Sequence, residues 1–343
     1  DDHNILLWIS ISKKIYSSLR YEPYVSVSIP MYQNIPLANE SSILISIEDF
    51  LISICHEQFI DEHNEFKREL LEAVVLFKQI YRFDLSYSRI INVFKRVIIL
   101  VDYIMEKLNF HIYEDILRFE LNHIFYIQGM IQHEMKSAVQ DIHKFKYQER
   151  KNQIELEGYL NKILNHYARL LFVRVDVGIL QEHQVNWDVE DFHRALEILR
   201  NRMSNKDTCF RHLQGCVWAF EQGAKKGYHC HLLLIYDGNM RDGDEWLGEE
   251  VGTYWQQCIT NNQGSYYNCN RKENKEKFEV NDLLGIGMIH RNQPQQLENA
   301  FRAGMYLVNP NKVDQRLRAK TSPNMRTFGI SQYDVDRRRN IIK

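Results

Sequence analysis

Two histidines one residue apart, His229 and His231, stand at the front of an apolar run in the second half of the sequence. In a β-strand, residues i and i+2 point to the same face, so we expect both imidazoles to project together and Cys230 to point the other way. Glu221 ends the preceding apolar run, and the segment GAKKG at residues 223–227 is typical of a hairpin between the two runs. A paired hairpin brings the Glu221 carboxylate to the face of the imidazoles.

Two imidazoles and one carboxylate suit Mg²⁺ or Mn²⁺ and leave coordination positions open for a substrate oxygen. The pattern therefore predicts a divalent metal site at Glu221, His229 and His231. A His-x-His pair by itself also arises by chance or through packing. The carboxylate across the hairpin is the feature that favours a metal.

The elements that position these residues follow from hydrophobic periodicity after about residue 151. A lead-in helix is predicted at residues 156–168, and the hairpin is followed by two further strands and two further helices. Strands are predicted at residues 169–179, 212–223, 228–238, 264–271 and 285–290, and helices at 186–204, 245–259 and 294–308. Asp188 is the predicted N-cap of the first of these helices, and Pro294 opens the last. The order β-α-β-β-α-β-β-α predicts an α+β domain with one antiparallel sheet flanked by helices.

The first half of the sequence has a different pattern. Residues 1–45 contain short β-like pieces such as 24–30, and residues 47–158 repeat apolar positions at helical spacing with almost no Gly or Pro. The six histidines within residues 47–158 share no ligand spacing. We therefore predict a mainly helical domain of unknown role at 1–155 and an α+β domain with a basic C-terminal tail at 156–343.

Composition bounds the class of protein. The chain has 343 residues, of which 44% are hydrophobic and 26% charged, as in soluble globular proteins. Its six cysteines form no CxxC pair, which favours reduced thiols in the cytoplasm. No apolar run approaches the ~20 residues that a membrane helix needs, and no secretory signal stands at the start. We therefore expect a cytoplasmic location and no membrane partner.

Charge is distributed unevenly. Residues 1–155 carry 17 Lys and Arg against 22 Asp and Glu, whereas residues 312–343 carry 9 basic against 3 acidic groups. The basic segment is either a solvated tail or an electrostatic footprint for a polyanion. In the second hypothesis the groups that contact DNA include Arg316, Arg318, Lys320 and Arg326.

The hairpin FEQGAKKGYHCHLLL resembles the metal-binding hairpin of parvoviral Rep nucleases, which belong to the HUH endonucleases. In those hairpins a Glu ahead of a Gly-containing turn is the third metal ligand. Further segments recur in the same order in a family of prophage and filamentous-phage (inovirus) replication-like proteins, over roughly residues 165–330. They are RVDV, GYHCHLLLIYDG, YWQQCI, YYNCN, GIGMIH and RTFG. The helical half carries no such resemblance.

The resemblance implies a nucleophilic tyrosine on a helix after the hairpin, and Tyr306 fits by order and by its predicted helix. Tyr266 and Tyr267 are rival aromatics for which stacking on bases or packing is an alternative role. Related enzymes often place a lysine three or four residues after the tyrosine. Here Asn309 and Pro310 take those places, and Lys312 is the catalytic lysine candidate.

Further DNA-binding candidates are Arg174, His290 and Arg326. His290 could instead cap a sheet edge, and Arg326 could pair with a carboxylate of its own domain. Arg174 and Asp176 share one strand face, where Asp176 is either an acid near the metal or the partner of a basic group.

The implied function is metal-dependent nicking of single-stranded or hairpin DNA through a covalent 5′-phosphotyrosine, which starts rolling-circle-type replication of a phage or mobile element. An alternative is a DNA-binding regulator or defence component on the same scaffold, with weak or no nicking, which the displaced lysine supports. A third hypothesis is a helical interaction protein. The sequence contains no Walker A motif, so a host helicase is an expected partner, and the helical domain could recruit it or another protein.

Overall fold

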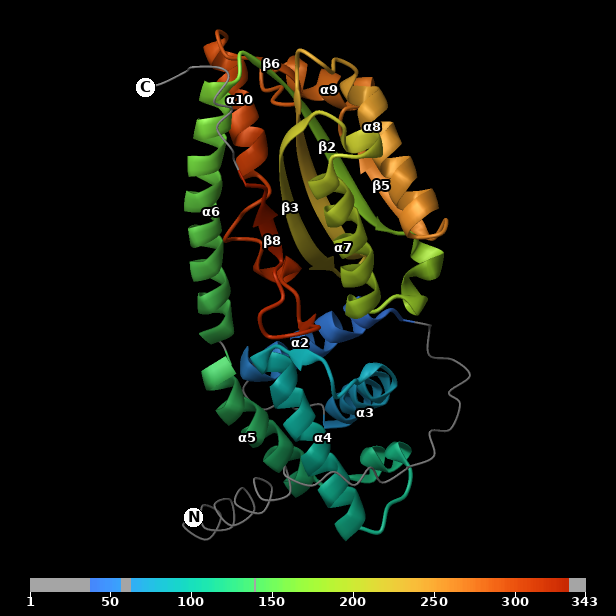
Figure 1. Cartoon of the computed structure of the whole chain (residues 1–343). Coiled ribbons are helices and arrows are strands. Elements are labelled where there is room, and N and C mark those ends of the chain that lie inside the picture. The colour runs from blue at the N-terminus through green and yellow to red at the C-terminus, as the bar shows by residue number, and fades with distance from the viewer. Residues whose placement is uncertain (1–37, 57–62, 139, 333–343) are drawn as a thin grey trace. The chain divides into compact units, whose positions relative to one another are not determined.

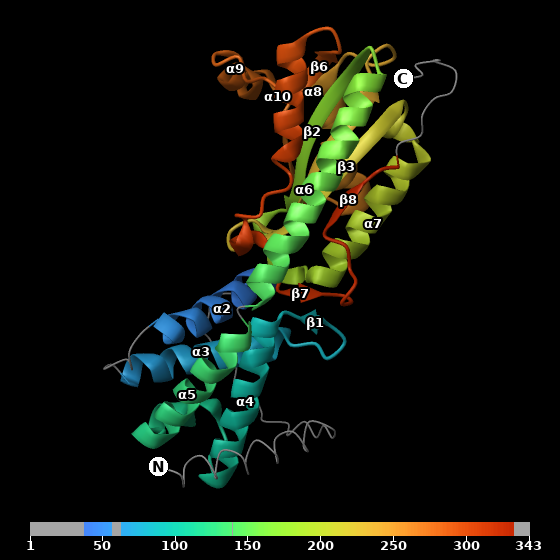
Figure 2. The same cartoon turned by 90° about the vertical axis from the view of Figure 1, so that its left-hand side faces the viewer.

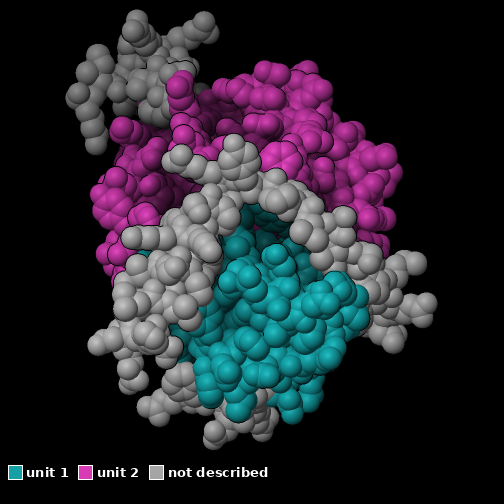
Figure 3. Space-filling model, turned by 90° about the horizontal axis from the view of Figure 1, so that it is seen from below, with its two compact units in different colours: residues 1–36, 47–81, 90–138 teal, residues 37–46, 82–89, 139–343 magenta. Residues whose placement is uncertain are grey.

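The computed structural model describes residues 38–56, 63–138 and 140–332 (Figure 1). The β-like piece predicted at 24–30 and the last part of the basic tail lie outside the described residues. The chain divides into two compact units, coloured in Figure 3: unit 1 holds residues 1–36, 47–81 and 90–138, and unit 2 holds 37–46, 82–89 and 139–343. The predicted α+β class is confirmed.

The described part of unit 1 is helical, as its periodicity predicts. Its elements are the later part of α2 (Glu40–His56), α3 (His63–Ile80), nearly all of α4 (Arg89–Lys107), the 3₁₀ helix η1 (Tyr113–Arg118) and α5 (Leu121–Ala138). Apolar residues at three and four spacing give α4 a wide buried stripe. Phe94 on that stripe meets Phe50 and Phe77 edge-on, with ring centroids 6.4 and 5.5 Å away. None of the described helices combines the length and the apolar character needed to cross a membrane.

Unit 2 is built on an antiparallel sheet with the strand order β5-β2-β4-β3-β8, and β6 pairs with another part of β2. The strands are β2 (Arg169–Ile179), β3 (Leu213–Gly223), β4 (Gly227–Asp237), β5 (Gly264–Asn268), β6 (Gly287–His290) and β8 (Phe328–Ile330). A second, two-stranded ladder joins β1 (Ser86–Tyr87) to β7 (Ala319–Lys320). The five longer predicted strands are all present, and the three short ones are additions of the structure.

The predicted hairpin between β3 and β4 is confirmed, and its register decides the site. Glu221 lies directly opposite His229, and Gly223 opposite Gly227, so three residues form the loop. Gly227 has a φ of +63°, the left-handed conformation that ends such a loop and that glycine adopts without strain.

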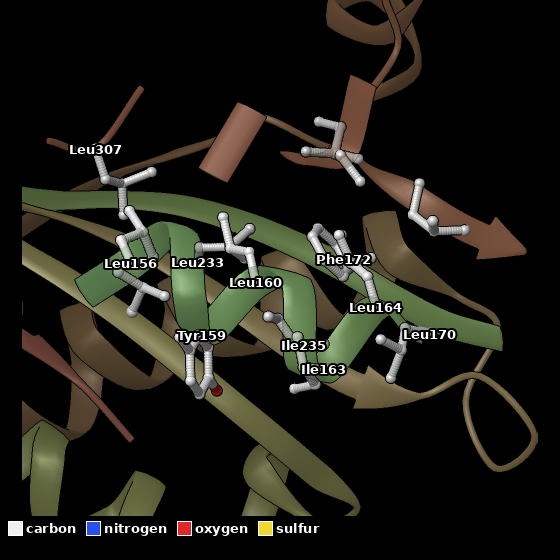
Figure 4. Close-up of a cluster of buried hydrophobic side chains, with 14 of the residues drawn as sticks. Leu156, Tyr159, Leu160, Ile163, Leu164, Leu170, Phe172, Leu233, Ile235 and Leu307 are labelled. Carbon is white, nitrogen blue, oxygen red and sulfur yellow. The ribbon is translucent and has the colours of Figure 1, made fainter. Parts of the chain in front are cut away.

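Helices cover the two faces of the sheet. The long α6 (Gln140–His166) and α10 (Pro294–Met305) lie along one face (Figure 2), where Leu160 and Ile163 pack on Leu233 and Ile235 of β4 (Figure 4). The domain boundary predicted at residue 155/156 falls inside α6, a helix that belongs to unit 2.

The opposite face carries α7 (Val189–Asn205), α8 (Asp244–Thr253) and the π-helical segment η4 (Tyr254–Ile259). Phe192 of α7 stacks on Phe220 of β3 with centroids 4.9 Å apart and contacts the ring of Trp255 at 5.5 Å. Asp188 caps α7 through a capping box, as predicted, because its carboxylate accepts from the backbone N–H groups of Glu190 and Asp191.

Two departures from the sequence prediction concern the last third of the chain. A helix, α9 (Lys272–Glu279), follows β5 where none was predicted; it is short and polar apart from Phe278, so it lacks an apolar stripe. The helix predicted at 294–308 ends at Met305, and Tyr306 is its C-cap residue. Leu307 and Val308 after it are buried in the core beneath α6. The backbone tightens there, because Leu307 N–H donates to the carbonyl of Gly304 and Val308 N–H to that of Met305.

Candidate metal centre

The β3–β4 hairpin brings Glu221, His229 and His231 together on the face covered by α6 and α10. One ligand atom from each residue lies within 4.8 Å of the others, and all three side chains are buried. Oε2 of Glu221 lies 3.2 Å from Nε2 of His231 and 3.7 Å from Nε2 of His229. Two imidazole nitrogens and a carboxylate oxygen therefore converge on one small volume, a donor set that suits a divalent cation.

The second nitrogen of each imidazole has a partner that turns Nε2 toward the centre. Nδ1 of His229 lies 3.1 Å from the carbonyl oxygen of Gly227, to which its N–H donates in the tautomer that leaves Nε2 as a lone pair. Nδ1 of His231 lies 2.6 Å from Oδ1 of Asp176. Partners of this kind orient metal-binding histidines and raise their basicity.

The sequence left two roles open for Asp176, and the structure places it behind His231. The two residues are direct partners in the β2–β4 ladder. Burial raises the pKa of Asp176, but His231, Arg174 and Lys226 outweigh burial and hold that pKa below its usual range. Nε of Arg174 lies 3.7 Å from Oδ1 of Asp176. Both sequence hypotheses for Asp176 therefore apply, since it is near the predicted metal ligands and also pairs with a basic group.

Lys312 reaches the centre although it stands six residues after Tyr306 and beyond Pro310. Its Nζ lies 3.0 Å from Oε1 of Glu221, the oxygen not shared with the histidines. Burial raises the pKa of Glu221, whereas His229, His231 and Lys312 together lower that pKa far below its usual range. The carboxylate is therefore anionic at neutral pH, as a metal ligand must be.

Tyr306 lies at the edge of this centre. Its ring has the Lys312 ammonium 4.8 Å from the centroid and the Arg174 guanidinium carbon at the same distance. The first cation pairs with Glu221, and the second pairs with Asp176. Tyr306 is 56% exposed, so its side chain is open to solvent.

The two rival tyrosines point to different faces. Tyr267 is opposite Asp176 in the β2–β5 ladder and therefore shares its face, but its hydroxyl donates to Oδ1 of Asn274. The Tyr266 hydroxyl donates to Glu249. Of the three tyrosines, Tyr306 is the one whose ring centroid lies 4.8 Å from both cations of the centre.

The predicted DNA-binding residues separate into distinct places. His290 pairs with Arg169 at the start of β2, seven positions from Asp176 and thus about 23 Å along the strand. Arg318 is 2% exposed, and its Nη1 donates to the backbone carbonyls of Asp314 and Arg316. The structure does not bring His290 to the centre.

Arg316 is also buried, and it donates to the carbonyl of Val313, so its guanidinium holds the chain after Lys312. Arg326 is exposed. Arg174 contacts the centre directly, because it pairs with Asp176 and lies over the ring of Tyr306. The sequence indicated that Asp176 and Arg174 could be functional, because both are charged residues on one face of an otherwise apolar strand.

Fold and site together define an α+β domain whose central hairpin carries a Glu/His-x-His ligand set beside a tyrosine and a lysine. The family model for the YagK/YfjJ C-terminal domain matches residues 133–331, which include the whole sheet and every residue of the centre. The match covers more than half of the chain, and the chain belongs to this family. No curated protein and no solved structure matches the chain.

Proposed function

We propose that this protein is a metal-dependent, single-tyrosine HUH endonuclease that nicks single-stranded or hairpin DNA. The observation that carries the proposal is the position of Tyr306. Its ring centroid lies 4.8 Å from the cations of both Lys312 and Arg174, and each cation pairs with a carboxylate of the Glu221, His229, His231 and Asp176 cluster.

The donor set fits Mg²⁺ or Mn²⁺. Its three ligand atoms lie within 4.8 Å of one another, and the remaining imidazole nitrogens face Gly227 and Asp176. A bound cation of this kind supplies Lewis-acid polarisation of the scissile phosphate and offsets the charge that develops on it.

The residues of the chain perform the transfer itself. The Tyr306 oxygen forms a bond to phosphorus, and the bond from phosphorus to the 3′ oxygen of the preceding nucleotide breaks. The hydroxyl proton passes to solvent, to which the exposed side chain has access, and the leaving 3′ oxygen takes a proton from solvent. The products are a 5′-phosphotyrosine and a free 3′-OH, so the phosphoester is conserved for a later strand transfer. Lys312 and Arg174 hold positive charge beside the transferring phosphate.

In this proposal the nick starts rolling-circle-type replication of a phage or mobile element in the cytoplasm. The helical unit recruits a host helicase or another protein. The alternative is a DNA-binding regulator or defence component with weak or no nicking. The sequence feature that supported this alternative is the displacement of Lys312 from the usual position of the lysine. Because Lys312 lies 3.0 Å from Glu221, we favour nicking.

The test uses the full chain, Mn²⁺ and a pool of labelled single-stranded and hairpin oligonucleotides. We expect a covalent protein–DNA band that maps to Tyr306, disappears in Tyr306→Phe and persists in the matched variant Tyr267→Phe. Omission of the metal or His231→Ala should also abolish the band. An adduct that persists in Tyr306→Phe would move the nucleophile elsewhere. Bound metal and bound DNA without any adduct would favour the regulator.

A further inference from the structure

A pocket of about 580 Å³ adjoins the metal centre within unit 2. Its walls come from β3, from α6, from residues 86–89 and from the segment after α10. Glu221 belongs to both sites, because it lines the pocket and its Oε2 faces the two histidines. Lys312, which forms an ion pair with Glu221, also lines the pocket.

The walls carry more positive than negative charge. The cationic side chains are Arg89, Lys144, Lys312, Arg316, Arg318 and Lys320, and the carboxylates are Asp141, Glu149 and Glu221. Lys312 pairs with Glu221, and Arg89 lies 3.3 Å from Asp141. The surplus charge suits an anionic ligand.

Lys320 is a partly buried cation of this pocket. Burial lowers the pKa of its ammonium group, and only the more distant charge of Asp141 opposes this effect. Within the described ranges, no hydrogen bond or ion pair engages its Nζ. A phosphate in the pocket would supply the partner that this partly buried cation lacks.

Aromatic side chains complete the pocket. Tyr87, Phe145 and Phe328 line it together with Leu307 and Leu317. Tyr87 is buried, and Phe145 and Phe328 are half-buried. Aromatic walls beside a cationic wall match the two parts of a nucleotide, a planar base and a phosphate.

We propose that this pocket binds one unpaired nucleotide of the DNA strand whose scissile phosphate lies at the metal centre. The inference rests on the proposed function, because Glu221 joins the two sites and a strand held at one must run past the other. Lys320 contacts the phosphate of that nucleotide, and Phe145 contacts its base.

The test measures binding and cross-linking, which do not require nicking. Full-length protein is mixed with single-stranded oligonucleotides that carry one abasic site or one 5-iododeoxyuridine at successive positions from the nick. We expect one position to cross-link to peptides within 86–89, 144–149 or 315–328. Lys320→Met should weaken binding about tenfold, whereas the matched loss of charge Lys272→Gln on α9 should not.

Phe145→Leu should weaken binding of the intact strand about fivefold and leave binding of the strand abasic at that position unchanged. Thermal melts of both pocket variants report whether the fold is kept. If nicking persists, no cross-link forms in the pocket and both variants bind as the wild type does, this inference is overturned and the proposed nuclease is kept. Pocket cross-links without nicking would refute the proposed nuclease activity and keep the nucleotide pocket. Loss of the cross-link to micromolar deoxynucleoside monophosphate would assign the pocket to free nucleotides and overturn the inference.

Discussion

The buried Glu40 should make the stability of unit 2 depend on pH. Oε1 of Glu40 accepts a hydrogen bond from the Tyr228 hydroxyl at 2.9 Å, so the bond anchors the residue that precedes His229. Burial raises the pKa of Glu40 from 4.5 to about 7, with a smaller contribution from Asp188. The hydrogen bonds from Tyr228 and Val189 and the charge of Arg82 oppose the rise without cancelling it.

The magnitude follows from the two pKa values. Between pH 4.5 and about 7 the folded state holds a proton on Glu40 that the unfolded state has lost. The stabilisation of the folded state by this proton is therefore fully present below pH 4.5, and it is lost as the pH rises through about 7. At about 1.36 kcal/mol per pKa unit, the full shift is worth roughly 3 kcal/mol, most of which falls between pH 5 and pH 8.

The assay compares urea unfolding of the wild type and Glu40→Gln at pH 5 and pH 8. Tryptophan fluorescence reports on unit 2, which holds four of the five tryptophans: Trp187, Trp218, Trp246 and Trp255. We expect the unfolding free energy of the variant relative to wild type to rise by about 2 to 3 kcal/mol from pH 5 to pH 8. The exposed Glu298→Gln is the control and should show no such trend. An equal difference at both pH values would refute the assigned ionisation of Glu40.

Three further predictions concern the centre, the core and the DNA-binding mode. Asp176→Asn should weaken Mn²⁺ binding about 10- to 100-fold in calorimetry, because His231 loses the carboxylate behind it; unchanged affinity would leave Asp176 a purely structural ion-pair partner. Leu160→Ala should destabilise unit 2 by about 2 to 5 kcal/mol, because Leu160 is fully buried between α6 and the sheet. Fluorescence-detected unfolding measures this loss, and a loss near zero would show that the surrounding residues close the space without leaving a cavity. The logarithm of the DNA association constant should fall linearly with the logarithm of salt concentration, and a constant indifferent to salt would argue against phosphate contacts by the C-terminal half.

Features set by neighbouring residues were predictable from the sequence. The predicted strand 169–179 coincides with β2, the hairpin forms around GAKKG, and Asp188 caps its helix. Each depends on local physics: side-chain alternation, loop geometry and a carboxylate within reach of the next backbone N–H groups. The same local geometry put Glu221, His229 and His231 on one face. Short strands such as β7 and β8 lacked enough residues to show a period.

The rest of the centre depended on contacts between residues far apart in the chain. Asp176 reaches His231 because β2 pairs with β4, a strand order that periodicity does not specify. Lys312 reaches Glu221 because the chain turns back after α10, and burial of Leu307 ended that helix at Met305. The sequence by itself thus determined the elements and the ligand hairpin. Only the tertiary structure decided which charges surround the hairpin, because pairing and burial are set by the whole packed chain.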